Sequence, residues 1–192
     1  AESGYFPRGD LKHTKELGSY LQGHPDVRKT PGIEAGTGSL GQGLSIGLGL
    51  ALGQKLDGIN RKTYVLIGDG EIAEGQIWEA AMAASAYHVD NLVAIVDKNG
   101  LQANGKVKER FDSGDIGAKF LSFGWNLIEI DGHNMEEILD ALDRADTVKG
   151  VPTVIIAHTV KGKGLSFAEN VVSYHNGKLD EETYAKALQE LA

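Results

Sequence analysis

Two side chains that can hold a metal cation follow two apolar stretches of this sequence. Asp69 comes directly after Gly68, beyond the apolar run 63–67, and Asn99 comes three residues after the apolar run 92–96. The carboxyl ends of parallel strands meet at one edge of an open α/β sheet, where such sheets bind ligands, so we expect the two side chains to meet there. Mg²⁺ prefers oxygen ligands and combines one or two protein groups with phosphate oxygens and water. The pair therefore predicts a magnesium site that holds a diphosphate.

The spacing of the pair agrees with this interpretation. Gly70 and Asn99 are separated by 28 residues, enough for one helix and one strand. The main-chain carbonyl of Leu101, just past the turn, is placed to be a third protein ligand. Each side chain also has an ordinary structural explanation, because an aspartate can cap a helix and an asparagine can form a turn beside Gly100. Only the joint pattern indicates a metal site.

The same glycines also fit a dinucleotide-binding fingerprint. Residues 68–73 match G-x-G-x-x-A after a predicted strand, and Asp97 is placed to bind a ribose. In such a site the pyrophosphate lies against the glycine turn and the helix N-terminus. The Asp69 carboxylate would repel that anion unless a cation lay between them. The sequence therefore favours the magnesium site and leaves the dinucleotide site as its rival.

Predicted strands and helices alternate, which indicates an α/β fold with a mostly parallel sheet and helices on both faces. The run LVAIV at 92–96 is apolar throughout, as a buried parallel strand requires. No repeat or linker interrupts the pattern, so we expect a single domain over 1–192. The predicted strands are 63–67, 92–96, 125–130 and 152–157; the predicted helices are 10–21, 39–58, 71–88, 114–123, 134–145 (opened by an Asn134–Glu137 capping box) and 180–191.

Glycine-rich segments lie beside these elements. Residues 24–38 have no periodicity and form a long loop, and loops of that length within a compact domain are usually functional. Gly43, Gly47 and Gly49 lie within the predicted helix 39–58, where each costs about 1 kcal/mol of helix propensity. We therefore expect close packing of this helix on the sheet to compensate.

Composition excludes several kinds of function. The net charge of −8 argues against nucleic acid or an anionic membrane as the main partner. The absence of cysteine excludes disulfides, cysteine-ligated zinc and a thiol nucleophile. No apolar run is long enough to span a bilayer and no signal peptide is visible, so we expect a cytoplasmic enzyme.

The Gly-Asp-Gly motif with its distant asparagine resembles the thiamine diphosphate signature, and the surrounding residues resemble the transketolase family. The resemblance covers nearly the whole chain, and it implies a thiamine diphosphate-binding fold of the diphosphate-domain type. The matching segments are GHPD at 23–26, TPGIEAGTGSLGQG at 30–43, GDGEIAEGQIWEA at 68–80, VDKNGLQ at 96–102 and VKGKG at 160–164.

This resemblance implies roles for individual residues. The cofactor diphosphate would be anchored through Mg²⁺, with Ca²⁺ or Mn²⁺ as possible substitutes, and Asp69, Asn99 and Leu101 would be the metal ligands. The implied cofactor-binding residues are these three together with Gly38 and Leu40 beside the aminopyrimidine, Gly68, Gly70 and Glu71 in the motif, and Lys161 and His175 in the later segment.

The resemblance also implies catalytic residues. His24 matches a histidine that binds the donor sugar, and His175 matches one that contacts the diphosphate and the substrate. The local sequence SYHNGKL departs from the family's WHGK segment, which weakens the second match. Glu74 and Glu79 match glutamates that link two active sites across a dimer interface. The ordinary alternatives are a surface loop position for His24 and exposed helix charges for Glu74 and Glu79.

Only one domain of a full transketolase is recognisable here. The pyrimidine-binding and C-terminal domains have no counterpart, as in forms split into two polypeptides, and a segment that precedes Gly4 in the family, with a Ser-Lys-Gly-His histidine, is also missing. We therefore expect a C-terminal partner subunit in an α₂β₂ assembly, sugar phosphates as substrates, and no activity without the partner. The alternatives are a 1-deoxyxylulose-phosphate synthase-like or 2-oxoacid dehydrogenase-like component, and a truncated module that binds cofactor without catalysis.

Overall fold

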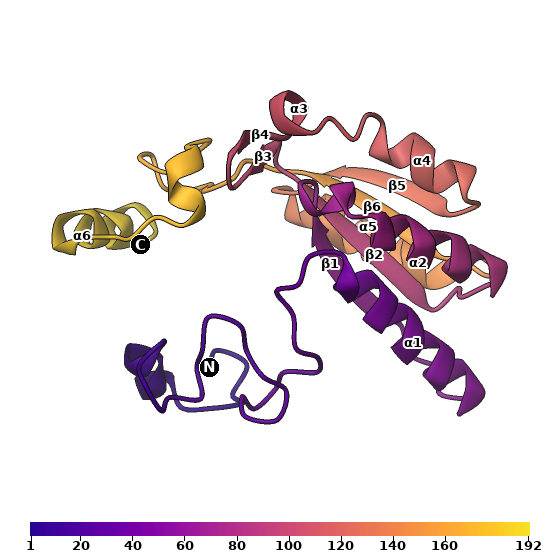
Figure 1. The fold of residues 1–192 in the computed structure, drawn as a ribbon, viewed down its shortest axis with the longest axis horizontal. Helices are drawn as coiled ribbons and strands as arrows, with labels where there is room; N and C mark the ends of the chain where they lie inside the picture. The colour runs from indigo at the N-terminus through magenta and orange to yellow at the C-terminus, as the bar shows by residue number, and fades with distance from the viewer.

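A four-stranded parallel sheet forms the centre of the molecule. The computed structural model describes all residues from Ala1 to Ala192. The strands are β1 (Thr63–Gly68), β2 (Leu92–Lys98), β5 (Asn126–Asp131) and β6 (Thr153–His158), in the order β1-β2-β6-β5 with every pair parallel (Figure 1). The four strands and the parallel α/β class predicted from the sequence are confirmed.

Helices cover both faces of this sheet, as predicted. Helices α1 (Gln42–Leu56), α2 (Gly75–Ala86) and α4 (Ile116–Ser122) pack on one face, and α5 (Met135–Thr147) packs on the other. In β2, Ala94 and Val96 belong to the first core cluster and Val93 to the second. This alternation explains why the strand is apolar along its whole length.

The close packing expected of the glycine-rich helix occurs mainly at one position. A Cβ at Gly47 would collide with the Val65 side chain of β1, so α1 approaches the sheet more closely than any larger residue allows. A Cβ at Gly43 would lie in ordinary contact, 3.7 Å from Val65, and one at Gly49 would meet nothing. The prediction is therefore confirmed for Gly47 but not for Gly49.

The predicted helix over 10–21 is wrong. Only a 3-10 helix, η1 (Arg8–His13), forms, and the chain leaves it at Thr14, where ψ is 129°. Lys15 and Gly18 then take φ values of 64° and 84°, which a right-handed helix cannot contain. Irregular structure continues through 24–38, as expected for the long loop.

The predicted helix over 71–88 is interrupted at its start. Residues Glu71–Ala73 form a 3-10 turn, η2, and Glu74 is extended, with ψ of 126°, before α2 begins at Gly75. The other predicted helices are confirmed, including the Asn134 cap, whose side chain accepts bonds from the amides of Glu136 and Glu137. Elements not predicted are β3 (Leu101–Gln102), β4 (Gly105–Lys106), α3 (Val107–Arg110) and η3 (Val172–His175).

Both terminal segments lie outside the layered body. Figure 1 shows the first residues as an irregular indigo segment and α6 (Glu181–Glu190) as a yellow helix, both on the side where β3, β4 and η3 are found. None of the helices combines the length and apolarity needed to cross a bilayer.

Candidate functional site

Asp69 and Asn99 meet at the carboxyl edge of the sheet. In the parallel register Gly68 lies opposite Asp97, and the amide of Asp69 donates to the Asp97 carbonyl at 3.1 Å. The Asp69 side chain reaches the turn that follows β2. There its Oδ2 accepts a 2.6 Å bond from the amide of Gly100, the neighbour of Asn99. The structure therefore brings Asp69 to the turn that contains Asn99.

One oxygen of the Asp69 carboxylate lacks a partner. Asp69 is only 3% exposed, and its Oδ1 is buried without any hydrogen bond. Burial raises the pKa of Asp69, and the charge of Asp97 acts in the same direction, while the amides of Gly100 and Gly70 and the charge of Lys161 oppose the rise. A buried acceptor with a free lone pair suits a cation. The donor set of this edge therefore fits Mg²⁺.

The Asn99 carboxamide is held at both ends. Its Nδ2 donates to Asp97 Oδ2 at 3.1 Å, and its Oδ1 accepts from the Leu101 amide at 2.9 Å. Asp97 Oδ1 also accepts a bond from the Thr159 hydroxyl. The amide oxygen keeps a second lone pair for a metal. The role of the Leu101 carbonyl as a ligand stays a prediction.

The Glu71 carboxylate accepts hydrogen bonds from two main-chain amides. Its Oε1 accepts a 2.8 Å bond from the Gly41 amide, and its Oε2 accepts a 3.2 Å bond from the Gly68 amide. Gly41 precedes α1 and Gly68 ends β1, so this one side chain joins two loops at the sheet edge. Glu71 therefore has a bridging role in this structure, and its implied contact with the cofactor stays a prediction.

Of the two glycines in the Gly-Asp-Gly motif, Gly68 and Gly70, only one is required by close packing. A Cβ at Gly70 would lie 2.9 Å from the Gln102 Cβ, so only glycine lets the motif lie against β3. Nothing lies within 4 Å of the corresponding position at Gly68. The structure therefore gives a packing reason for Gly70 alone.

His24 lies directly against Gly38. A Cβ at Gly38 would overlap the His24 imidazole, and Gly38 has a φ of 117°, so two independent constraints require glycine there. Leu40, 58% exposed, follows in the same loop just before α1. Three residues with implied cofactor or sugar contacts thus lie on one exposed loop that Glu71 ties to the Asp69 turn.

The segment that follows β6 reaches the carboxyl edge of the sheet, where Thr159 bonds Asp97. Lys161 lies close enough for its charge to act on Asp69. The turn η3, which ends at His175, packs beside β3, but the exposed His175 side chain makes no hydrogen bond to any other predicted site residue. The assignments of Lys161 and His175 to the cofactor site both stay predictions.

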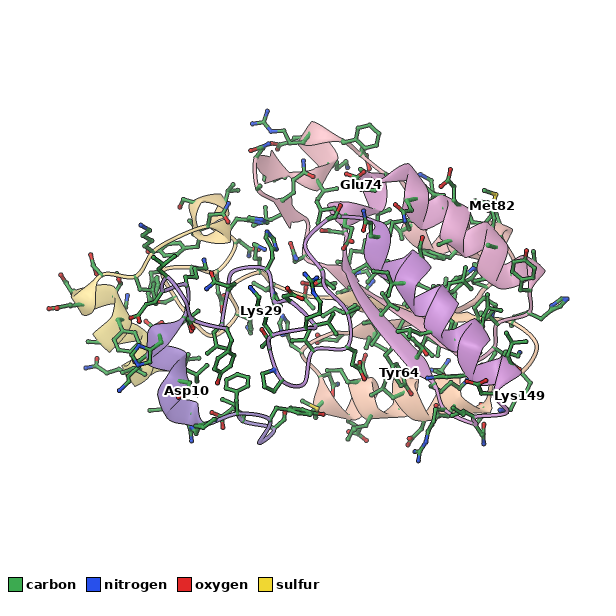
Figure 2. All side chains as sticks on the ribbon, turned by 60° about the horizontal axis from the view of Figure 1, so that its bottom comes forward. Asp10, Lys29, Tyr64, Glu74, Met82 and Lys149 are labelled. Atoms are coloured by element: carbon green, nitrogen blue, oxygen red, sulfur yellow. The ribbon has the colours of Figure 1, made fainter.

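Glu74 and Glu79 are both exposed. Glu74 precedes α2 and lies beside Gly41, where an added Cβ would be 2.8 Å from the Glu74 Cβ, and Figure 2 labels it at this end of the helical layer. Since Glu74 is extended, the two glutamates do not share one continuous helix as predicted. Their implied place at a dimer interface stays a prediction.

Sequence reasoning misses two residues of this network. The sequence suggests Asp97 only as a ribose-binding acid, and it suggests no role for Thr159. The signal for Asp97 is its place two residues before Asn99, within reach of that side chain. Nothing in the sequence indicates that Thr159, 62 positions further on, meets Asp97.

Comparison with known proteins identifies a family. Residues 4–192 match the family model described as "Transketolase, thiamine diphosphate binding domain". An apulose-4-phosphate transketolase subunit of Phocaeicola vulgatus is 42% identical over 189 residues, covering 98% of this chain and 67% of that protein. The 6-deoxy-6-sulfo-D-fructose transketolase subunit SqwG of Clostridium sp. is 44% identical over 191 residues, covering 100% of this chain and 70% of that protein.

A solved structure has the same fold. The transketolase of Campylobacter jejuni superposes with a TM-score of 0.88 at 35% identity, covering 95% of this chain and 29% of that one. The chain therefore spans about two thirds of the relatives named as subunits and less than a third of the longer enzyme.

Proposed function

Because the chain belongs to the transketolase family, as a thiamine diphosphate-binding domain of that family, we propose that it is the cofactor-binding subunit of a split transketolase. It would form a single cofactor-binding domain. Transfer of a two-carbon ketol unit from a ketose phosphate to an aldose phosphate would require a second subunit with the pyrimidine-binding domain. Relatives named as transketolase subunits support this division.

The unpartnered Asp69 oxygen is the observation that carries the proposal. It is buried at the strand ends where α/β sheets bind ligands, and Asp69 bonds the turn in which the Asn99 carboxamide oxygen retains a lone pair. Asp69, Asn99 and the Leu101 carbonyl would hold Mg²⁺, or Mn²⁺ or Ca²⁺ in its place, and through it the diphosphate. A buried carboxylate at this position would repel the pyrophosphate of a dinucleotide. The dinucleotide-binding interpretation of the glycine turn is therefore less well supported.

Thiamine diphosphate, when bound, supplies the carbon chemistry of ketol transfer, and the protein supplies placement and charge. Asp69 and Lys161 would set the charge around the diphosphate. Glu71 would hold the Gly38–Leu40 loop against the motif, and Gly38 would keep His24 facing the site. His24 and His175 are proposed to contact the sugar, because neutral imidazoles can share protons with hydroxyl groups.

The assembly is proposed to be an α₂β₂ complex in the cytoplasm, with Glu74 and Glu79 at the contact between copies. The test is to mix the purified chain with a candidate partner that carries the pyrimidine domain, and to measure ketol transfer from xylulose 5-phosphate. We expect activity in the mixture and none in either chain alone. Activity of this chain by itself would refute the division of labour, and acceptance of pyruvate as donor would favour the other thiamine diphosphate enzymes.

A further inference from the structure

The carboxylate of Asp97 lies between the hydroxyl of Thr159 and the carboxamide of Asn99. We propose that Asp97 is a positioning residue that fixes the orientation of the Asn99 amide, so that the amide oxygen, and not its NH₂ group, faces the cation held by Asp69. This role rests on the proposed function, since it concerns the cation of the cofactor. It assigns Asp97 a task separate from metal ligation.

The two ends of a carboxamide differ in their chemistry. They are nearly equal in shape, but only the oxygen can bind a metal, whereas the NH₂ group can only donate. Nothing within Asn99 itself selects the useful orientation. A neighbour that only accepts hydrogen bonds would select it, because the NH₂ group must then turn toward that neighbour.

Asp97 is such a neighbour. An ionised carboxylate only accepts, and Asp97 Oδ2 accepts the 3.1 Å bond from Asn99 Nδ2. At the other end the Leu101 amide, which only donates, bonds Asn99 Oδ1 at 2.9 Å. The two contacts specify the same orientation, which keeps the amide oxygen within the turn whose Gly100 amide bonds Asp69.

The carboxylate of Asp97 is itself held in place. Its Oδ1 accepts from the Thr159 hydroxyl, and the Thr159 amide donates to the Lys98 carbonyl at 3.3 Å, which fixes the segment after β6 beside β2. Both carboxylate oxygens of Asp97 are therefore engaged by protein groups. The Asp97 carbonyl also accepts the Asp69 amide bond, so one residue holds the main chain of Asp69 and the side chain of Asn99.

A reciprocal exchange of side chains provides the sharpest variant. In the double variant Asp97→Asn/Asn99→Asp, the new amide at 97 can accept from Thr159 and donate to the new carboxylate at 99. That carboxylate can still accept from the Leu101 amide and offer an oxygen to the cation. Every hydrogen bond and the net charge are retained, with the polarity of one bond reversed. In Asp97→Asn alone, the new amide can donate to Asn99 and permit the unproductive orientation.

The first experiment follows the Asn99 side-chain amide by NMR in the chain without metal or cofactor. We expect its NH₂ protons to exchange slowly with water in the wild type, at least about tenfold faster in Asp97→Asn, and at an intermediate rate in Thr159→Val. Asp131→Asn is the matched control: it removes a carboxylate from the end of β5, and that carboxylate accepts a bond only from the His133 amide, at 2.9 Å. That control should leave the Asn99 signal unchanged, and equal exchange in wild type and Asp97→Asn would overturn the proposal.

The second experiment measures the affinity of Mn²⁺ in the presence of thiamine diphosphate by electron paramagnetic resonance. Loss of a group that orients a ligand typically weakens metal binding by about 10–100-fold, which is the effect expected for Asp97→Asn. The double variant should recover to within a few-fold of the wild type. A double variant no better than Asp97→Asn, with both folded by thermal melting, would contradict the proposal. If the wild type binds no Mn²⁺, the proposed function fails, and the NMR result still decides the role of Asp97.

Discussion

At the residue scale, the Asp69 carboxylate is stabilised by the protein on one side only. Its Oδ2 accepts a main-chain bond, and its Oδ1 is buried without a partner. Burial raises the pKa of Asp69 above that of an ordinary aspartate, so the ionised form is disfavoured in the folded state. The metal-free protein is therefore less stable than it would be with a neutral side chain at this position.

Replacing Asp69 by Asn should stabilise the metal-free chain at pH 7–8. Because the pKa is raised on folding, the wild type loses stability as the pH rises from the ordinary aspartate value through the raised value, and the full cost is present above it. We expect the melting temperature of Asp69→Asn to be higher by about 2–4 °C, the shift that about 1 kcal/mol causes in a chain of this size. The difference should disappear at acidic pH, and a variant melting below the wild type at pH 7.5 would contradict it.

Replacing Glu71 by Gln should destabilise the loops at the sheet edge. Both carboxylate oxygens accept main-chain bonds, so a glutamine would keep one bond and turn an NH₂ group toward the other amide. We expect a loss of about 1–2 kcal/mol, measured by urea unfolding. Glu74→Gln is the matched control, since Glu74 is exposed and its carboxylate makes no hydrogen bond. Equal stability of the two variants would refute the bridging role.

At the scale of the elements, Asp90 joins the end of α1 to the loop that precedes β6. Its Oδ1 accepts from Lys55 Nζ at 2.8 Å, and its Oδ2 accepts from the Gly150 amide at 2.9 Å. Burial acts to raise the pKa of Asp90, but the Gly150 and Lys55 bonds and the charge of Lys149 outweigh it and lower the pKa. Asp90 thus stabilises the fold when ionised.

The stability contributed by Asp90 should depend on pH in the opposite sense to Asp69. A lowered folded-state pKa means that the contribution is present above the ordinary aspartate pKa and is lost as the pH falls through the lowered value. Asp90→Asn should therefore cost about 1 kcal/mol at pH 7 and nothing at the acid end of the range. Urea unfolding at several pH values measures this, and a cost that persists in acid would show that packing, not charge, is responsible.

Strand β1 should respond very differently to truncation on its two faces. Ile67 is 1% exposed within the larger core cluster, whereas Leu66 is 71% exposed on the opposite face of the same edge strand. Ile67→Ala should cost about 2–5 kcal/mol, and Leu66→Ala less than about 1 kcal/mol, in free energy of unfolding. Similar costs for both would contradict the exposure of Leu66 in this structure.

At the scale of the whole molecule, the parts predicted well from the sequence are those with strong local signals. The apolar run of β2 and the capping residues of α5 depend on neighbours in the chain, so they can be recognised without the fold. The meeting of Asp69 with the Asn99 turn was also predictable, because parallel strands joined by one crossover must end at the same sheet edge.

Other features depend on contacts between distant parts of the chain. In place of the predicted helix at 10–21, the segment folds back on itself, and the Tyr20 hydroxyl donates a 2.6 Å bond to Asp10. Glu71 reaches Gly41, 30 positions earlier, and Thr159 reaches Asp97 from the end of another strand. No spacing rule predicts such pairs, so the bridging and positioning roles become visible only in three dimensions.

The central claim is that the chain binds thiamine diphosphate through a divalent cation at the Asp69–Asn99 edge. Isothermal titration calorimetry of thiamine diphosphate into the purified chain, with Mg²⁺ and then with EDTA, tests it most directly. We expect thiamine diphosphate binding to require Mg²⁺ and to be weakened at least about 100-fold in Asp69→Ala, where a metal ligand is lost. Binding that persists in EDTA, or that is equally tight in Asp69→Ala, would contradict it.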